Sequence, residues 1–330
     1  MTPLFAPIGT RIHRFWFRPV TASGFGLMRM AFGATTLLNM AMQWRNVQRY
    51  YGPHGILPQE FVGLALRKEW RFSLLDNIQA WGTDALYWLL LLTLALVMIG
   101  YGTRIILAVS LFLLFSFHEY GIVLLDGGDS LLHIIGFILF LSPCYKTFTI
   151  HHLVRKLRKT PKKAAIKRPP PVTMPIWPYR LLLWQMVWIY ATAAYYKMGG
   201  VLWYSGSAVA VVMHHGLFAR LPVPVADALS FLSPTITWFT VFSQLAWVLL
   251  LLFPMLAWIG LRIPTGGLKR FLIVCGILVH GGIMLTMDVG TFSLAVFVSY
   301  CGLLLDEDFL ALRRWREKIR GAYHTLRQWY

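Results

Sequence analysis

The stretch WQMVWIYATAAYYKMGGVLWYSGSA, residues 184–208, decides the fold. It consists mainly of aromatic, aliphatic and small residues, and its single charged residue is Lys197. A run of about 20 such residues is long enough to cross the hydrocarbon of a bilayer as a helix. The ammonium group of Lys197 would be poorly hydrated there unless a partner compensates. The stretch therefore predicts a membrane helix that delivers one lysine to the edge of the bilayer.

Helical spacing predicts which residues share a face with Lys197. The residues 3, 4, 7 and 11 positions earlier are Ala194, Ala193, Tyr190 and Met186. The alanines leave space beside the lysine stem, and Tyr190 supplies a hydroxyl deeper in the helix. Glycines at 199–200 let the backbone turn before Trp203. From these residues alone, Lys197 is either a snorkelling anchor in an aromatic belt or a reactive amine.

The composition is that of a membrane protein. Of 330 residues, 57% are hydrophobic and 13% are charged, whereas soluble domains carry about 25% charged residues. Apolar runs of roughly 17 to 25 residues predict an all-α, polytopic integral membrane bundle of about eight transmembrane helices. The predicted spans are 23–42, 84–101, 104–122, 130–146, 179–197, 236–259, 269–287 and 290–305. Short gaps within 84–122 and 269–305 predict two tight antiparallel hairpins.

The distribution of charge predicts the orientation and the organisation of the chain. Lysine and arginine accumulate in cytoplasmic loops, and the segment 146–168 carries nine basic residues and no acidic one. We therefore expect both termini in the cytoplasm and Lys197 on the non-cytoplasmic side of the membrane. The expected parts are a four-helix half at 1–145, a basic Pro-rich linker at 146–178, a four-helix half carrying the site at 179–305, and a basic tail at 306–330. The stretch from Pro169 to Pro178 at the end of the linker is expected to be a stiff hinge.

Several classes of function are disfavoured. The net charge of +18 does not indicate nucleic-acid binding, because the basic residues lie between apolar spans and no recognition module accompanies them. The cysteines, Cys144, Cys275 and Cys301, have no disulfide or metal-ligand spacing. The sequence contains no phosphate loop, nucleophile elbow or zinc motif. No metal is expected, and any chemistry should come from an embedded lysine, histidines and carboxylates.

Other polar residues in the predicted spans have two interpretations each. Arg29 lies inside the first span, where it either serves function or snorkels to headgroups. Asp129 and His133 are four residues apart and share a helix face. They are either a carboxylate and base beside Lys197, or a helix cap and a core histidine. His280, in the middle of a span, is either a site residue or a hydrogen-bonded core residue.

Motifs along the chain resemble one known family. Tyr190, Lys197 and Trp203, followed by Gly206 and Ser207, match a lysine-to-tryptophan pattern. Further matching stretches are FWFRP, YGPHGILP at 51–58, FHEYGIVLLDGGDSLLHIIGFILFLSP at 117–143 and HGGIMLTMDVGTFSLAVFVSY at 280–300. In this order they resemble the vitamin K-dependent γ-carboxylase superfamily, including its small bacterial members, the horizontally transferred transmembrane (HTTM) proteins.

The resemblance implies a role for each candidate residue. In the carboxylases the matching lysine is taken to deprotonate a reduced quinone, whose reaction with oxygen generates a strong base. This implies Lys197 as general base with Asp129 and His133 as catalytic neighbours, and a reduced, vitamin K-like quinone as cofactor. The implied substrate-binding residues are Tyr190, Trp203, His280, Arg29 and Gln244.

The sequence departs from the family pattern at two of these positions. Asp129 stands where the carboxylases have a histidine, and Gln244 stands where family members often carry a carboxylate, which removes one possible partner of Lys197. The substrate therefore stays open. Two functions are carried forward: a lyase-like or quinol-epoxidising membrane enzyme acting on a lipophilic small molecule, and a non-enzymatic maturation factor that contacts a secreted peptide.

Overall fold

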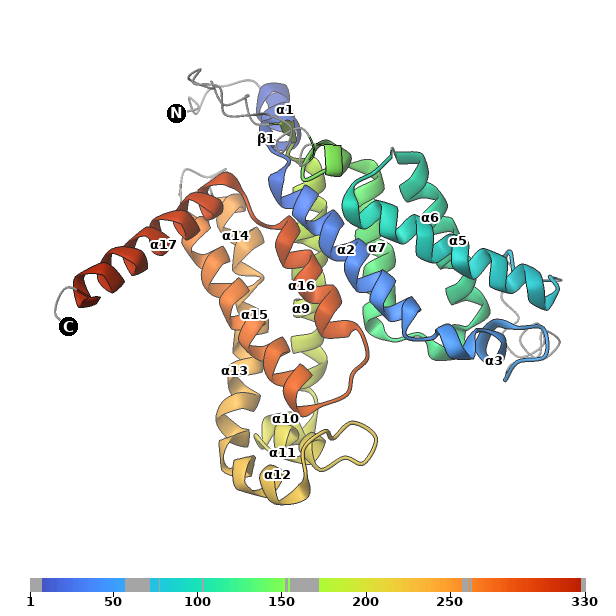
Figure 1. Ribbon diagram of the computed structural model, residues 1–330. Helices are drawn as coiled ribbons and strands as arrows, with labels where there is room; N and C mark the ends of the chain where they lie inside the picture. Colours follow the sequence, from blue (N-terminus) through green and yellow to red (C-terminus); the bar gives the residue numbers. More distant parts are fainter. Residues whose placement is uncertain are drawn as a thin grey trace.

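A computed structural model describes residues 8–56, 72–76, 78–102, 104–151, 154, 172–256, 261 and 263–327. Its described part is mostly helical, as predicted (Figure 1). The long helices are α2 (Ser23–Ala41), α5 (Ala80–Ile99), α6 (Arg104–Tyr120), α7 (Gly127–Leu141), α9 (Trp177–Met198), α13 (Ser233–Ala246), α14 (Leu249–Leu256), α15 (Gly266–Thr286), α16 (Phe292–Gly302) and α17 (Asp306–Arg327). Each predicted span overlaps one of these helices or, at 236–259, the consecutive α13 and α14, with residues 257–259 outside the described part of the chain.

Shorter elements connect these helices. They are α1 (Ile8–Phe17), α3 (Val47–Tyr51), α10 (Val201–Tyr204), α11 (Ala208–Met213), α12 (Val223–Leu229) and the 3-10 turns η1 (Trp44–Asn46), η2 (Ile122–Leu124), η3 (Cys144–Lys146) and η4 (Ser230–Leu232). Figure 1 shows α10, α11 and α12 gathered at one end of the bundle, and α1 at the opposite end.

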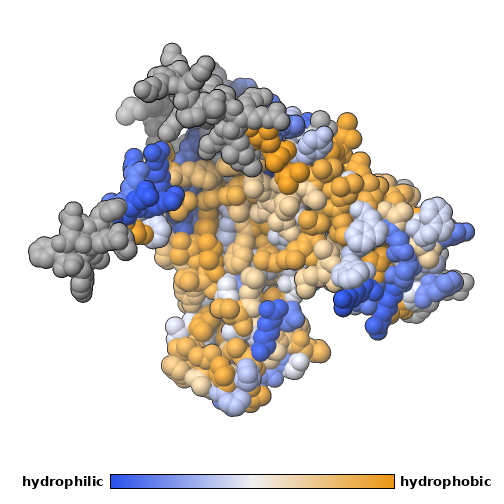
Figure 2. All heavy atoms as spheres, viewed as in Figure 1, coloured by the Kyte–Doolittle hydropathy of each residue, from blue (hydrophilic) through white to orange (hydrophobic). Residues whose placement is uncertain are grey.

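Three helical segments of the described chain have the length and apolar composition needed to cross a membrane: Ala80–Ile99, Val223–Leu256 and Gly266–Thr286. The apolar helices Gly127–Leu141 and Phe292–Gly302 are shorter. Figure 2 shows an apolar surface along the bundle, with hydrophilic residues at its margins. Trp188, Phe242 and Leu278 are among the large apolar side chains that are exposed in the structure. A helix that is apolar both inside and outside the bundle suits a hydrocarbon environment.

Glycines end helices where the chain reverses. Gly100 follows α5 with φ +69°, and its N–H bonds to carbonyls of the last turn, so the chain can re-enter the bundle as α6. Gly290, with φ +59°, lies between α15 and α16. A Cβ at Gly290 would come within 1.9 Å of the Asp126 carboxylate, so neither the backbone angle nor the space admits a side chain.

A two-stranded sheet ties the N-terminal segment to the start of α9. Strand β1 (Pro19–Thr21) pairs antiparallel with β2 (Thr173–Pro175), with Val20 opposite Met174. Part of the predicted hinge, 169–171, lies outside the described residues. The rest of it forms β2 and the first turn of α9, where Pro178 takes an early helical position that needs no N–H partner.

The core lies where α2, α7, α9 and α16 meet. Gly24 of α2 faces the backbone of Leu304, and Gly302 of α16 faces the side chains of Met28 and Leu182, at distances that leave no space for a Cβ. Phe25, Phe32 and Val296 are among the fully buried side chains of this region. Helix α16, late in the chain, therefore packs against α2 and α7 from the N-terminal half, as Figure 1 shows.

Candidate functional site

A cavity of about 500 Å³ lies between α9, α13 and α15, and residues of α11 and α12 also contribute to its wall. Most of its wall is aliphatic. The wall also includes five of the residues that the sequence singled out: Tyr190, Lys197, Trp203, Gln244 and His280. Ligand pockets of 300 to 1,000 Å³ with a few polar groups on an apolar wall are typical of small-molecule sites. This cavity is therefore the candidate site.

Lys197 reaches the cavity from the last turn of α9. Its Nζ donates a hydrogen bond of 3.0 Å to Oε1 of Gln244 on α13, and it lies 5.0 Å from the centroid of the Trp203 ring. No carboxylate forms an ion pair with Lys197 within the described part of the chain. The expectation that Gln244 removes a partner needs correction, because its amide oxygen is the partner. The amine thus has a neutral acceptor and an aromatic face.

The local fold follows the predicted helix face. Ala193 lines the cavity beside Lys197, and Ala194 is fully buried, so the lysine stem lies over small side chains. Gly199 is the C-cap of α9, and Gly200, in an extended conformation, is the N-cap of α10. This sharp change of direction brings Trp203 back over the end of α9.

A second polar group in the cavity is centred on His280 of α15, which is 2% exposed. Its Nε2 lies 3.2 Å from the hydroxyl of Tyr190, which is hydrogen-bonded in turn to the hydroxyl of Tyr300. Its Nδ1 lies 3.5 Å from Oγ of Ser293. The Trp247 ring stacks on Tyr190 with 4.8 Å between ring centroids. This network holds the imidazole in one orientation at the wall of the cavity.

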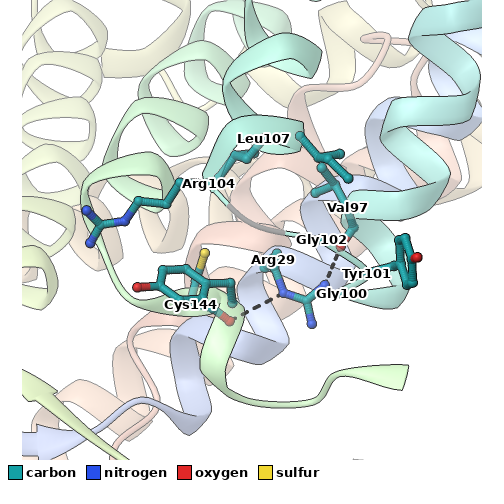
Figure 3. A pocket seen from close by; sticks show the side chains of 10 residues that line it. Arg29, Val97, Gly100, Tyr101, Gly102, Arg104, Leu107 and Cys144 are labelled. Carbon is teal, nitrogen blue, oxygen red and sulfur yellow. Dashed lines mark hydrogen bonds between the residues drawn. The ribbon is translucent and has the colours of Figure 1, made fainter. Parts of the chain in front are cut away.

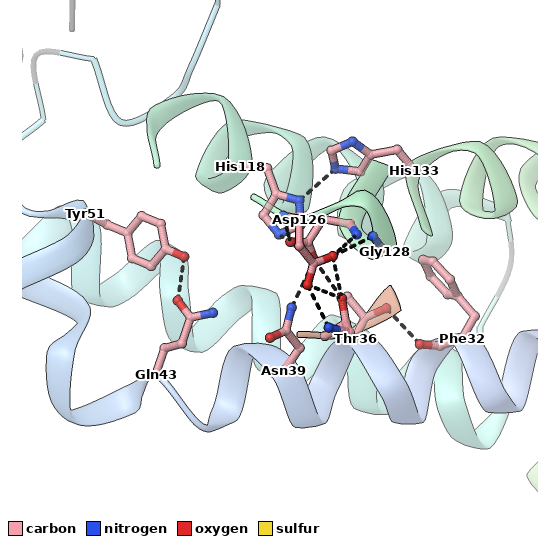
Figure 4. Close-up of polar contacts among 11 residues, drawn as sticks. Phe32, Thr36, Asn39, Gln43, Tyr51, His118, Asp126, Gly128 and His133 are labelled. Atoms are coloured by element: carbon pink, nitrogen blue, oxygen red, sulfur yellow. Dashed lines mark hydrogen bonds and ion pairs between the residues drawn. The ribbon is translucent and has the colours of Figure 1, made fainter. Parts of the chain in front are cut away.

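Asp129 belongs to a different cluster at the start of α7, where its neighbours include Asn39 and Asp126, which Figure 4 labels. Asp126 is the N-cap of this helix, and its carboxylate accepts from the N–H of Asp129. The carboxylate of Asp129 in turn accepts from the N–H of Asp126 at 3.1 Å, which completes a capping box. Oδ1 of Asp129 accepts from Asn39 at 3.1 Å and from the Thr291 hydroxyl at 3.4 Å. The helix-cap interpretation of this segment is therefore confirmed, with Asp126 rather than Asp129 as the N-cap.

His133 faces His118 and not Lys197. Its Nε2 lies 2.9 Å from Nδ1 of His118, and Nε2 of His118 lies 4.0 Å from Oδ1 of Asp129 (Figure 4). Neither Asp129 nor His133 lines the cavity of Lys197. The expectation that they neighbour Lys197 is thus wrong. Spacing along one helix fixes the shared face, but it does not tell which neighbouring helix that face meets.

Arg29 is neither at the cavity nor snorkelling. It is 3% exposed, and its guanidinium donates to the carbonyls of Met98 at 3.2 Å and Phe148 at 2.8 Å. Further acceptors are the carbonyls of Val97, Cys144 and Thr147. Figure 3 shows it beneath the end of α5, beside Gly100 and Cys144. Arg29 therefore satisfies carbonyl groups that helix ends leave unpaired, which is a structural task.

A polar contact joins the two short helices that contribute to the cavity wall, α11 and α12. Nε2 of His214, after α11, lies 2.8 Å from Oδ1 of Asp227 on α12, and Nδ1 lies 2.7 Å from the carbonyl of Ala210. These hydrogen bonds, to the backbone and then to the carboxylate, raise the pKa of His214 above its ordinary value. The neighbouring His215 packs against the Phe218 ring instead. Among the described residues, no cluster of His, Cys, Asp or Glu is arranged to hold a metal ion.

Three members of these polar clusters were missed by sequence reasoning: His118, Tyr300 and Trp247. Each belongs to a different element from its partner, and only the packing brings them together. His118 and Tyr300 do lie inside the stretches 117–143 and 280–300 that carry the family resemblance, so those stretches were the available signal.

The cavity and the two polar clusters are thus defined by geometry alone. No protein-family model, curated protein or solved structure matches the chain.

Proposed function

We propose that this chain is an HTTM-like integral membrane protein of the bacterial inner membrane, with about eight spanning helices and both termini in the cytoplasm. We further propose that its cavity binds a lipophilic molecule, such as a reduced quinone, and that Lys197 acts on it as a general base. A quinone is proposed as the ligand because the sequence resembles the vitamin K-dependent carboxylase superfamily. The support for a site comes from the cavity itself.

The observation that carries the proposal is the meeting of Lys197, Gln244 and His280 on one largely apolar wall. The residues come from three different helices, α9, α13 and α15. Polar groups that converge in this way in an apolar cavity are the usual mark of a binding or active site. Groups that only stabilise helix packing would be expected to satisfy one another without leaving a cavity beside them.

The wall also suits access from the bilayer. Ile236 and Phe239 on α13 and Leu278 on α15 line the cavity and are exposed side chains. An apolar rim between two helices lets a hydrophobic molecule move between the hydrocarbon and the cavity without crossing water. A molecule with an apolar body and one or two hydroxyl groups fits this lining, because the hydroxyl groups can meet the polar atoms.

The chemistry assigned to the chain is proton transfer. An uncharged Lys197 amine accepts a proton from a hydroxyl of the bound molecule, and the ammonium that forms keeps its bond to Oε1 of Gln244. The Trp203 ring, 5.0 Å from Nζ, offers the new cation a π face. The Tyr190 hydroxyl can donate a hydrogen bond near the developing negative charge. A reduced quinone, when bound, would supply the acidic hydroxyl group and the reactivity towards oxygen.

The test uses the full chain in nanodiscs with a prenylated naphthohydroquinone as probe. Binding of the probe is measured by quenching of tryptophan fluorescence. Oxygen-dependent consumption of the probe is measured by chromatography, with protein-free nanodiscs as the blank. Lys197→Met should bind the probe but consume it roughly 10²- to 10⁴-fold more slowly, which is the usual contribution of a general base. Lys146→Met, at an exposed lysine of η3, is the matched control.

Equal turnover by wild type and Lys197→Met would contradict the catalytic role. A wild-type protein that binds the probe and never consumes it would contradict enzymatic function and favour the alternative of a maturation factor for a secreted peptide.

A further inference from the structure

Helix α17 begins at a rigid anchor on the bundle. The carboxylate of Asp308, which is 2% exposed, bonds to the buried Lys269 and, at 2.7 Å, to Nε of Arg270. Burial alone would raise the pKa of Asp308, but the hydrogen bonds from Arg270 and Lys269 lower it below its ordinary value. Asp306 accepts a further bond from Thr21 of β1. The first turn of α17 is thus fixed to α15 and to the N-terminal segment.

Beyond this anchor, α17 has an apolar stripe without a partner in the described part of the molecule. Leu312, Trp315 and Ile319 follow one another at spacings of three and four, so they lie on one face of the helix. Their exposed fractions are 53%, 64% and 49%. Three large apolar side chains on one face, including a tryptophan, are costly to leave in water.

The flanks of the stripe are basic. Between residues 309 and 320 lie Arg313, Arg314, Arg316, Lys318 and Arg320, with Glu317 as the single acid. Arg313 pairs with Glu317 at 3.1 Å, and Arg316 and Arg320 are exposed side chains that form no ion pair among the described residues. Figure 1 shows α17 leading away from the bundle, across the direction of α15 and α16, at the end of the molecule where α1 and β1 lie.

We propose that α17 is an in-plane membrane helix whose apolar stripe enters the interface of the bilayer and whose arginines and lysine bind anionic phospholipid headgroups. A strongly amphipathic, basic helix with tryptophan on its apolar face is suited to this position. The anchor at Asp308 places the helix beside the bundle, where such an interface lies in a membrane protein. Complementary charge selects anionic lipid as the occupant. The inference does not depend on the chemistry at Lys197.

The test measures the environment of α17 in the full chain by electron paramagnetic resonance. Ile319→Cys places a spin label on the stripe, and Glu317→Cys places one on the opposite face. Both are made in a Cys301→Ser background, because Cys144 and Cys275 are buried. In nanodiscs containing phosphatidylglycerol, the label at 319 should be accessible to oxygen and shielded from a water-soluble nickel chelate. The label at 317 should show the reverse.

The charge requirement is tested with matched pairs. Arg316→Gln with Arg320→Gln removes two positive charges four residues apart, and Arg45→Gln with Arg49→Gln does the same near η1 and α3. Each basic residue at an anionic surface contributes roughly a fivefold factor, so the first pair should lower the ratio of docked to undocked label roughly 30-fold. The second pair should leave it unchanged.

Two results would overturn the proposal. One is a label at 319 that stays accessible to the nickel chelate in phosphatidylglycerol nanodiscs. A label that becomes shielded only after soluble protein is added would count as the same result, because the stripe would then bind a protein and not lipid. The other is equal docking in phosphatidylcholine and phosphatidylglycerol, with no effect of the Arg316 and Arg320 pair.

Discussion

Replacing Gln244 by Leu tests whether the amine of Lys197 is uncharged in the resting protein. General-base chemistry requires a free electron pair on Nζ, and the nearest described acceptor of its protons is Oε1 of Gln244 at 3.0 Å. Leucine keeps much of the glutamine volume and removes this acceptor. The free energy that couples the two side chains therefore reports the charge of the amine.

The expected magnitude follows from the kind of bond. A hydrogen bond between neutral groups contributes about 0.5 to 1.5 kcal/mol, and one to a charged group about 1.5 to 3 kcal/mol. Between membrane helices, couplings average about 0.6 kcal/mol and reach about 1.7 kcal/mol. A single bond between Gln244 and an uncharged Lys197 amine should thus give about 0.5 to 1.5 kcal/mol. An ammonium in this apolar cavity should exceed that range.

The measurement is a double-mutant cycle of wild type, Gln244→Leu, Lys197→Met and the double variant. Unfolding free energies come from titration with sodium dodecyl sulfate in mixed micelles, followed by circular dichroism. Thr240→Val with Lys197→Met is the control cycle. Thr240 lies one turn before Gln244 and lines the cavity, but its hydroxyl donates to the carbonyl of Ile236. The control coupling should stay within about 0.5 kcal/mol of zero.

A coupling above about 2 kcal/mol would mean that Gln244 stabilises a charged ammonium. Lys197 would then be protonated in the resting protein, and its role as general base would be refuted. A coupling near zero would show instead that the bond is not formed in the folded protein.

Three further predictions follow from buried or clamped polar groups. Asp308→Asn should destabilise the protein by about 3 to 5 kcal/mol, because Lys269 stays buried without its carboxylate; a loss below about 1 kcal/mol in detergent unfolding would contradict this. The bonds of His214 hold it protonated, so the contact with Asp227 is complete below the ordinary pKa of about 6.5 and is lost as pH rises through the raised value. Hydrogen exchange of 208–229 should accelerate over that rise, and Asp227→Asn should move the change to lower pH. Arg29→Leu should lower the free energy of unfolding by at least about 3 kcal/mol, since several buried carbonyls lose their donor. A clearly smaller loss, measured by thermal unfolding in detergent, would contradict this.

Much of the fold could be predicted because long apolar helices can be recognised from the composition of each segment alone. The apolar runs around Leu90, Leu113 and Ile273 predict helices whose bounds lie within a few residues of those observed, since a long apolar run without a helix breaker favours one continuous helix. The position at which one helix ends and the next begins within an apolar run depends on contacts with other segments. Nothing in the apolar run 236–259 predicts the change from α13 to α14 at Trp247 and Val248, because Trp247 takes its position from stacking on Tyr190.

The candidate site could be predicted only along single helices. The face shared by Tyr190, Ala193 and Lys197 follows from helical period, and the structure keeps it. Contacts between helices follow from packing, which spacing does not encode. Arg29 illustrates this limit: its place inside a span is visible in sequence, but the carbonyl groups that bind it come from the end of α5 and the turn after α7.

The connection between α15 and α16 joins the two polar clusters. Thr291 is the N-cap of α16, and its N–H donates to Oδ2 of Asp126 at 2.7 Å. The next residue, Phe292, lines the cavity with its ring centroid 5.5 Å from that of His280. Gly290 allows this approach because its φ is +59° and a Cβ would meet the Asp126 carboxylate. A carboxylate of the N-terminal half therefore fixes one wall of a cavity whose lining comes entirely from 189–292, so that lining depends on the N-terminal half for its shape.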